Sequence, residues 1–334
     1  MNIKYYIRPL IDAYCQHYLH YRKSKQRLAL VIGMMPWQNI VGDWVFEHKH
    51  YQIQRHFSER YFNLLLKPFI QNINPVIYIW GYKAPAYFIE YAREQNLDIF
   101  FLEDGFIRSS PNDENGSPPL SIVIDSQAPY FDTTRPNDLT DLMVNFDFEQ
   151  DGYDDVLAQE MLDYYVTHRV SKYNHQPYID IDLIYGIKNK KRILILGQVP
   201  HDDSLKYGGG VGITLLDVVS RAIEENPEAQ IIIKPHPMTL NDPSIISTLT
   251  ELDCLILTQS IHLVDALETI DHVYTITSLG GLEALLRGKN VTVLGRPFYY
   301  EWILKNRKVQ KYSLAKIYYV LTKVHYVLSS TATN

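Results

Sequence analysis

Short apolar runs alternate with segments of helical pattern along most of the chain. In the first half, the runs typical of strands are residues 28–34, 75–81, 97–104 and 120–125. Between the second and third of them lies APAYFIEYAREQN, residues 84–96, which has the length and pattern of a crossover helix. A strand, helix, strand order of this kind predicts a parallel sheet covered by helices on both faces.

The second half repeats the alternation more regularly. Its expected strands are short and almost wholly apolar, and helical segments separate them: residues 192–199, 230–237, 254–260, 272–278 and 291–297. This pattern predicts a second Rossmann-like half. Two such halves facing each other form a central cleft at the carboxyl ends of both parallel sheets, which is where ligands bind in open α/β folds.

Composition sets the domain boundary and the broad class. Residues 137–170 are acidic and helical in pattern, and residues 175–191 show no clear period. We therefore expect an N-terminal domain over 1–185, a second over 186–310, and a C-terminal helix over 311–334 that packs back across the domains. A chain of 334 residues with 46% hydrophobic and 21% charged residues is typical of a globular protein with two cores.

Charge, cysteines and hydropathy exclude several classes. A net charge of −6 argues against a nucleic-acid binder. Cys15 and Cys254 are too few for a disulfide framework or a cysteine zinc site, so a reducing cytoplasm is expected. No run approaches the roughly 18 apolar residues of a membrane span. Residues 1–27 predict an amphipathic helix, with packing on the domain favoured over contact with a membrane surface.

Polar residues follow the strands at five places in the two halves. They are Glu103-Asp104, Gln198 through Ser204, Lys234 through Pro237, Thr277-Ser278 and Arg296-Pro297. Because the carboxyl ends of strands line the cleft of such folds, this recurrence predicts a polar active site.

The KPHP sequence ends the second strand of the second half. Each proline fixes its own φ and restricts the residue before it, so the backbone of His236 is rigid. Lys234 and His236 can both face a phosphate or a carboxylate. The alternative is a strand exit whose histidine caps a helix, and we favour the anion site.

The sequence TITSLGGLEALLRGK predicts a strand, a tight turn and a helix. Ser278 and the amides of Gly280 and Gly281 would then lie at a helix N-terminus, which attracts phosphate. Glu283, in the first turn, is placed to accept hydrogen bonds from ribose hydroxyls. The alternative is that Glu283 only stabilises the helix N-terminus, worth about 0.3–1 kcal/mol.

Residues 197–212, GQVPHDDSLKYGGGVG, place two aspartates and a glycine cluster after a strand. The glycines allow close approach to a ligand, although a flexible loop with solvated aspartates explains the pattern equally well. It is neither a Walker loop nor GxGxxG, and HExxH, CxxC and GxSxG are absent from the sequence. For His48 and His50 an exposed charged loop is preferred to a metal site, and no metal is expected.

Taken together, these segments resemble the bacterial capsule and lipopolysaccharide β-Kdo glycosyltransferases. The resemblance spans roughly residues 75–302, and the pieces that carry it are WGYKAP (80–85), FLEDGFIRS (101–109), PPLSIVID (118–125), the stretch at 130–136, KYN (172–174), GQVPHDDS, NPEAQIIIKPHP, TITSLGGLEALLRGK and VTVLGRPFYYEW. One departure follows Pro-Phe-Tyr, where the family commonly has Gly-Trp-Gly-Leu-Thr and this chain has YEWILKNRKV, residues 300–309.

The resemblance implies a GT-B fold, with the first domain on the acceptor side and the second binding the nucleotide sugar. It further implies CMP-β-Kdo as donor and transfer with retention, which by double displacement requires a carboxylate nucleophile and a second carboxyl group. By position in the motifs, Asp202 is the expected nucleophile, with the adjacent Asp203 as alternative. Glu103 is the expected acid/base, and His236 belongs to the same catalytic set. Asp104 is expected to brace the turn against Arg108.

The implied donor carries a phosphate and a carboxylate. Lys234, His236, Ser278 and the amides of Gly280 and Gly281 are the expected phosphate contacts, and either Arg108 or Arg135 would hold the sugar carboxylate. The remaining donor-binding residues implied are Gln198, Ser204 and Glu283. CMP is already a good leaving group, so its departure needs electrostatic stabilisation more than protonation. The resemblance to GT-B enzymes of this kind implies neither a cofactor nor a bound metal.

The expected function is therefore Kdo transfer to a lipid-linked or oligosaccharide acceptor, by a cytoplasmic enzyme peripheral to the inner face of the inner membrane. A GT-B transferase or epimerase using another nucleotide sugar is the alternative among enzymes. A non-catalytic subunit that binds nucleotide sugar or polysaccharide in an export assembly is the alternative outside them. The basic, aromatic stretch from Lys305 to Leu328 fits packing across the domains better than contact with an anionic membrane.

Overall fold

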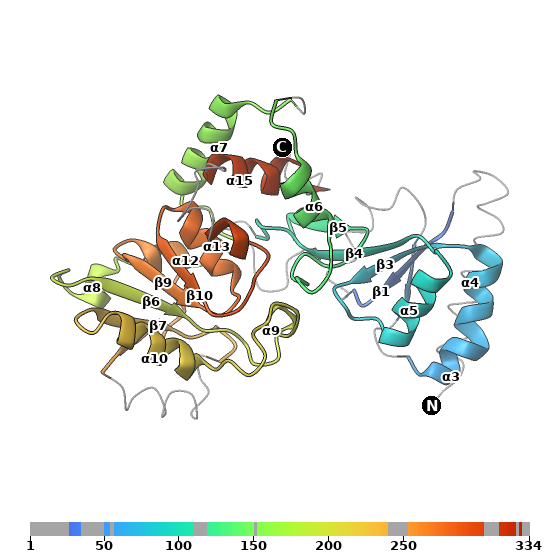
Figure 1. Ribbon diagram of the computed structural model, residues 1–334, viewed down its shortest axis with the longest axis horizontal. Helices are drawn as coiled ribbons and strands as arrows, with labels where there is room; N and C mark the ends of the chain where they lie inside the picture. Colours follow the sequence, from blue (N-terminus) through green and yellow to red (C-terminus); the bar gives the residue numbers. More distant parts are fainter. Residues whose placement is uncertain are drawn as a thin grey trace. The chain divides into compact units, whose positions relative to one another are not determined.

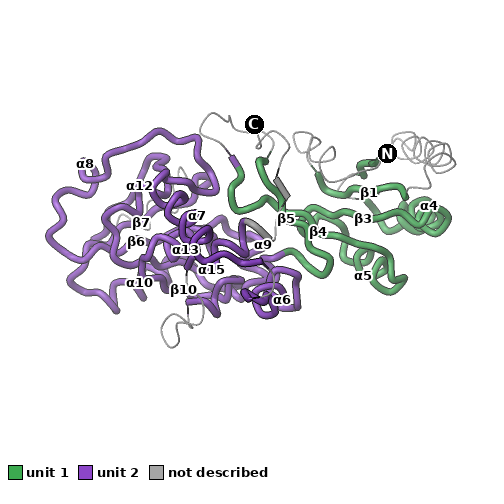
Figure 2. The backbone as a smooth tube through the Cα atoms, turned by 90° about the horizontal axis from the view of Figure 1, so that it is seen from above, with its two compact units in different colours: residues 1–108, 114–129, 325–334 green, residues 109–113, 130–324 purple. Residues whose placement is uncertain are grey.

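A computed structural model describes residues 27–34, 50–53, 57–109, 119–149, 152–239, 253–303, 314–324 and 327–328 (Figure 1). The chain divides into two compact units (Figure 2). Unit 1 holds residues 1–108, 114–129 and 325–334, and unit 2 holds residues 109–113 and 130–324. The helix expected over residues 1–27 and His48 lie outside the described residues, apart from Arg27.

Unit 1 is built on a sheet with the strand order β11-β5-β4-β3-β1-β2. The strands are β1 (Ala29–Ile32), β2 (His50–Ile53), β3 (Val76–Trp80), β4 (Ile99–Asp104), β5 (Ser121–Asp125) and β11 (Val327–Leu328). The first four are parallel, as the alternation predicted, and His50 begins a strand instead of lying in a loop. The expectation of a wholly parallel sheet is wrong for β5, which runs antiparallel to β4. Apolar runs do not encode strand direction, and an antiparallel edge on a parallel sheet is common in α/β folds.

Helices bury one apolar face of this sheet. The predicted crossover helix is present as α5 (Ala86–Glu94), and it buries Phe88, Ile89, Tyr91 and Ala92. The preceding segment comprises α3 (Glu59–Tyr61), the π-helical η2 (Phe62–Leu66) and α4 (Lys67–Ile73). These elements share one apolar core with β1, β3 and β4, and in it Leu30, Leu66, Ile77 and Phe88 are each 0% exposed. Burial of this kind is the main favourable contribution to folding.

Unit 2 contains a wholly parallel sheet with the order β10-β9-β6-β7-β8. Its strands are β6 (Arg192–Leu196), β7 (Gln230–Lys234), β8 (Leu255–Ile256), β9 (His272–Thr275) and β10 (Asn290–Val293). The helices between them are α9 (Asp203–Tyr207), α10 (Leu215–Glu225), α12 (Leu263–Leu267) and α13 (Leu279–Leu286). This half matches the predicted Rossmann-like alternation strand by strand.

The division between the units differs from the boundary expected at 185/186. Helices α6 (Asp138–Asn145), α7 (Asp155–Thr167) and α8 (Asp182–Tyr185) all belong to unit 2. Arg192, fully buried at the start of β6, gives a physical reason: its guanidinium donates to the carbonyl oxygens of Tyr185 and Gly186. A buried cation requires such acceptors, so the segment before β6 packs with unit 2.

The C-terminal segment contributes to both units. Helix α15 (Leu314–Tyr319) packs on α7 in unit 2, where the Tyr165 and Tyr318 rings lie 4.8 Å apart. The π-helical η3 (Val320–Val324) follows, and β11 then pairs antiparallel with β5 in unit 1. Among the helices of the described residues, none has both the length and the hydropathy needed to cross a membrane.

Candidate active site

In unit 2, the carboxyl ends of β6 and β9 are joined by the carboxamide of Gln198. Its Oε1 accepts a hydrogen bond from the Thr277 backbone N–H at 2.7 Å, and its Nε2 donates to Thr277 Oγ1 at 3.0 Å. The same Nε2 donates to Ser204 Oγ at 3.3 Å. The structure therefore brings together Gln198 and Ser204, two predicted donor-binding residues. Thr277, which the sequence indicated only as a polar strand end, links them.

Asp202 forms the N-cap of α9. Its Oδ1 accepts a hydrogen bond from the Ser204 N–H at 2.8 Å, while no residue in the described part of the chain hydrogen-bonds its Oδ2. Asp203 is the first residue of α9. Capping alone is a structural reason for an aspartate at position 202, but asparagine and serine cap helices equally well. The exposed Asp202 thus combines a fixed orientation with one carboxylate oxygen left available.

Lys234 ends β7 half-buried, and no carboxylate of the described residues lies within ion-pair distance of its ammonium group. Burial lowers the pKa of Lys234 because it disfavours the charged form. A bound anion would raise the pKa of Lys234 again, because it favours the charged form. A half-buried lysine without a counter-charge is costly for a folded protein, and it is the arrangement expected where an anionic ligand supplies the missing charge.

His236 lies two residues beyond Lys234. Burial lowers the pKa of His236; the Asp202 carboxylate nearby acts to raise it, and Lys234 acts to lower it. The imidazole is therefore neutral at pH 7. Its Nδ1 accepts the Met238 N–H at 3.1 Å, which places the ring proton on Nε2. His236 thus presents a neutral N–H donor beside the Asp202 carboxylate and the Lys234 ammonium.

The helix start predicted at Ser278 is confirmed, and it is bonded within the protein. Ser278 is the N-cap of α13, its Oγ accepts the Gly280 N–H at 3.2 Å, and its carbonyl oxygen accepts the Gly281 N–H at 3.0 Å. A Cβ added at Gly281 would lie 2.4 Å from the Tyr299 hydroxyl oxygen, and one at Gly280 would lie 2.8 Å from Leu196 Cδ1. Close packing therefore accounts for both glycines. Their predicted contact with phosphate stays a prediction.

Glu283 is buried, with 5% of its surface exposed. The Tyr165 hydroxyl donates to its Oε2 at 3.2 Å and the Lys172 N–H to its Oε1 at 3.3 Å, while Arg287 lies 3.7 Å away in an ion pair. The predicted contact with ribose gains no support from this geometry. Both oxygens instead connect α13 to α7 and to the KYN segment, which explains that part of the motif.

Glu103 belongs to unit 1, where it stands half-buried in β4 opposite Val123 of β5. The turn after it is held in place. Asp104 forms an ion pair with Arg108 at 3.8 Å, which confirms the expected brace. Gly105 donates its N–H to the Ser121 carbonyl oxygen at 2.9 Å, and a Cβ at Gly105 would lie 2.2 Å from Ser121 Oγ. The glycine of EDGF is thus required for the turn that follows Glu103.

The two arginines expected to hold a sugar carboxylate lie in different surroundings. Arg108 is buried in unit 1, with 7% of its surface exposed, next to Asp104. Arg135 is half exposed in unit 2 and lies 3.3 Å from the fully buried Asp132. Arg135 is the more accessible of the two.

Two residues of unit 2 that belong to this region were missed in the sequence. Thr133 Oγ1 donates to the carbonyl oxygens of Tyr207 at 3.1 Å and Arg296 at 2.9 Å, so it anchors the glycine loop. His262 is buried and donates from Nε2 to the Tyr173 carbonyl oxygen at 2.9 Å. Burial lowers the pKa of His262 to about 4. No local pattern marks either residue, because their partners lie far away in sequence.

The sequence also matches known proteins. A family model described as capsule polysaccharide biosynthesis protein matches residues 76–185 and 157–316. The lipopolysaccharide-processing protein LpsZ of Rhizobium meliloti is 29% identical over 309 residues, covering 88% of this chain and 68% of that protein. The capsule polysaccharide modification protein LipA of Neisseria meningitidis is 35% identical over 230 residues, which is 67% of this chain. The match covers only 32% of LipA.

Two solved structures of Thermosulfurimonas dismutans KpsC are similar over nearly the whole chain. The β-Kdo 2,4 transferase has a TM-score of 0.72 at 25% identity, over 94% of this chain and 95% of that chain. The β-Kdo 2,7 transferase has a TM-score of 0.65 at 25% identity, over 91% and 93%. The fold is thus the predicted α/β fold of GT-B type. Because the family model matches well over half of the chain, this chain belongs to the capsule polysaccharide biosynthesis protein family.

Proposed function

We propose that this chain is a retaining glycosyltransferase that moves Kdo from CMP-β-Kdo to a lipid-linked or oligosaccharide acceptor, in the cytoplasm at the inner face of the inner membrane. The observation that carries the proposal is the group formed by Asp202, Lys234 and His236 in unit 2. It combines an available carboxylate oxygen, a half-buried cation without a counter-charge and a neutral N–H donor. The similarity to the two KpsC β-Kdo transferase structures supports Kdo as the sugar.

In the first step, Asp202 Oδ2 attacks the anomeric carbon of Kdo. The bond from that carbon to the phosphate oxygen breaks, and its electron pair leaves with CMP. An anionic nucleophile that approaches a donor with two anionic groups requires positive charge and hydrogen-bond donors. Lys234 and the Nε2–H of His236 supply these to the phosphate as negative charge develops on it, and Arg135 holds the Kdo carboxylate.

In the second step, an acceptor hydroxyl attacks the same carbon from the opposite side and releases the Asp202 carboxylate. We assign Glu103 as the general base that takes the proton of the acceptor hydroxyl. Two inversions give net retention. We prefer Asp202 to Asp203 as the nucleophile because the cap of α9 orients its carboxylate and leaves Oδ2 without a hydrogen-bond partner in the described part of the chain.

The test is intact-protein mass spectrometry after incubation with CMP-Kdo generated in situ. Wild type, Asp202→Asn, Asp203→Asn and Glu103→Gln would be measured in parallel. Asparagine keeps the cap of α9, so Asp202→Asn removes the nucleophile without removing the helix start. We expect a Kdo-sized mass gain with release of CMP in all variants except Asp202→Asn, and its slow loss in Glu103→Gln.

The adduct, the release of CMP and the preference for a nucleotide together distinguish three other outcomes. An adduct that disappears in Asp203→Asn but persists in Asp202→Asn would move the nucleophile by one residue. Binding of UDP in preference to CMP, without CMP release in any variant, would point to a different nucleotide sugar. Binding of CMP without turnover on any acceptor would favour a non-catalytic subunit.

A further inference from the structure

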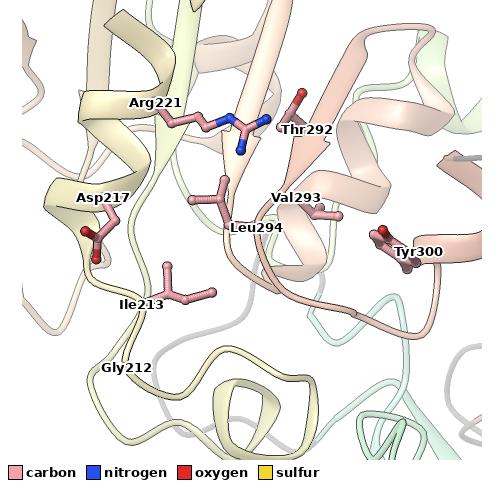
Figure 3. Close-up of a pocket in the computed structure, with 8 residues that line it drawn as sticks. All are labelled: Gly212, Ile213, Asp217, Arg221, Thr292, Val293, Leu294 and Tyr300. Carbon is pink, nitrogen blue, oxygen red and sulfur yellow. The ribbon is translucent and has the colours of Figure 1, made fainter. Parts of the chain in front are cut away.

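A hollow lies in unit 2, between helix α10 and the edge strand β10 (Figure 3). Its volume is about 570 Å³, within the range of small-molecule sites. In the sheet, β9 and β6 separate β10 from β7, which carries Lys234. The hollow is therefore distinct from the group formed by Asp202, Lys234 and His236.

The accessible lining of the hollow is mostly polar, along its rim, and a smaller apolar part lies at its floor. Ile213, Val293 and Leu294 are half-buried and form the floor. Asp217 and Arg221 come from α10 on one side, and Tyr300 stands on the other (Figure 3). A ligand rich in hydrogen-bonding groups, with a small apolar face, fits this lining.

The rim side chains are held in place but keep free hydrogen-bonding atoms. Asp217 Oδ2 accepts from the N–H and the hydroxyl of Thr214, both at 2.7 Å, and Oδ1 has no partner in the described part of the chain. Arg221 donates from Nε to Glu225 Oε1 at 2.6 Å, and Glu225 Oε2 accepts from the Tyr274 hydroxyl at 2.7 Å. An exposed pair of this spacing is usually loose. Here the buried Tyr274 anchors it, so the terminal nitrogens of Arg221 are oriented and have no partner among the described residues.

The charge of the rim selects against acidic ligands. Arg221 and Asp217 are the charged residues of the lining. Arg221 is paired with Glu225, and Arg296 beside the Tyr300 ring is paired with Glu301, so Asp217 is the charge left without an ion-pair partner among the described residues. An acidic sugar such as Kdo would meet a net negative surface. A neutral ligand avoids this repulsion and can still use both signs of charge for its hydroxyl groups.

We propose that this hollow binds a neutral hexopyranose unit of a glycan chain. One C–H face of the sugar ring packs on Ile213 and Leu294, with Tyr300 closing the side. Asp217 Oδ1 accepts from a sugar hydroxyl, and the Arg221 guanidinium donates to another. The site holds acceptor glycan at a distance from the transfer chemistry. The inference rests on the proposed function only in that the chain handles glycans, and it is independent of the donor.

The experiment is a titration of the full-length, ¹⁵N-labelled protein with methyl β-glucoside, methyl β-galactoside and Kdo as probes, without CMP. We expect the amide signals of Gly212 and Val293 to shift with at least one neutral glycoside and not with Kdo. Arg221→Ala and Tyr300→Ala should each weaken that binding at least fivefold. Arg60→Ala, an exposed arginine on α3 of unit 1, is the matched control and should leave binding unchanged.

Binding in the Asp202→Asn variant should equal that of wild type, so failure of the transfer chemistry and failure of this site are distinguishable. Absence of shifts at Gly212 and Val293 with both neutral glycosides would overturn the proposal. Binding that excess CMP displaces, or that persists at full strength in both Arg221→Ala and Tyr300→Ala, would overturn it as well.

Discussion

The sequence predicted an anion site both at the exit of β7 and at the start of α13. In unit 2, the polar groups at α13 are hydrogen-bonded within the protein, whereas those at the exit of β7 are so only in part. At α13, Ser278 and the amides of Gly280 and Gly281 are hydrogen-bonded to one another, and Glu283 is enclosed by Tyr165, Lys172 and Arg287. At β7, Lys234 has no carboxylate partner in the described part of the chain, and His236 keeps one ring nitrogen for donation. Polar residues whose hydrogen bonds and ion pairs are all made within the protein stabilise the fold. Polar residues that lack such partners are the better candidates for binding substrate.

Substitution of Lys234 by methionine gives the largest effect expected from this comparison. Methionine keeps the length and apolar character of the stem while removing the charge. We expect the rate of Kdo transfer to fall by roughly 10²–10³-fold, as for loss of one transition-state donor. The free energy of unfolding without substrate should stay constant or rise, because a half-buried cation without a partner is removed. Steady-state kinetics and urea unfolding measure the two quantities.

If Lys234→Met lost stability and kept its transfer rate, Lys234 would be a residue that stabilises the fold and not one that binds substrate. Lys206→Met is the control, because Lys206 is an exposed lysine of the same unit that contacts the Tyr207 ring. It should change neither quantity appreciably.

Glu283→Gln should show the opposite signature. It leaves Arg287 buried opposite a neutral amide, and breaking a buried pair in this way costs about 3–5 kcal/mol of unfolding free energy. The transfer rate, measured well below the unfolding temperature, should stay within about threefold of wild type. The double variant Glu283→Gln with Arg287→Met should recover part of the lost stability. A large loss of rate at unchanged stability would instead establish Glu283 as a donor contact.

Acidification tests the buried His262, whose ring donates to Tyr173 and lies near Lys234. Burial lowers the pKa of His262 to about 4 in the folded protein, so the unfolded state binds the proton more strongly. Stability is then complete above about pH 6.5 and is lost as the pH falls toward 4. From this residue we expect a loss of about 2–3 kcal/mol between pH 7 and pH 4.5.

Urea unfolding at the two pH values checks this expectation. Glutamine can keep the hydrogen bond to the Tyr173 carbonyl without titrating, so His262→Gln should lose less stability on acidification than wild type. Equal pH dependence in both proteins would show that the titration of His262 contributes little.

The sequence predicts this molecule best where the relevant physics is local. The apolar runs predicted strands β6, β7 and β9. The polar residues after these strands predicted a shared site, with Gln198, Ser204, Lys234 and His236 in it, because parallel strands bring their carboxyl ends to one edge of the sheet. The brace between Asp104 and Arg108 is also local, at a spacing of four residues.

Contacts between distant segments escaped prediction. The Tyr165 hydroxyl that binds Glu283 is 118 residues away in sequence, so no motif could show that this carboxylate is enclosed. The antiparallel direction of β5 and the packing of residues 130–185 with unit 2 likewise depend on tertiary pairing that hydrophobic periodicity does not encode.

The pairing of β11 with β5 has a consequence for the order of folding. The outer edge of β5 in unit 1 is covered by residues 327–328, which are synthesised after all of unit 2. During translation, the β5 backbone groups that later bond β11 are therefore open to pairing with other chains, a known route to aggregation. The sheet of unit 1 is begun before unit 2 is synthesised and gains β11 only afterwards, so the β5 edge lacks this partner throughout the synthesis of unit 2.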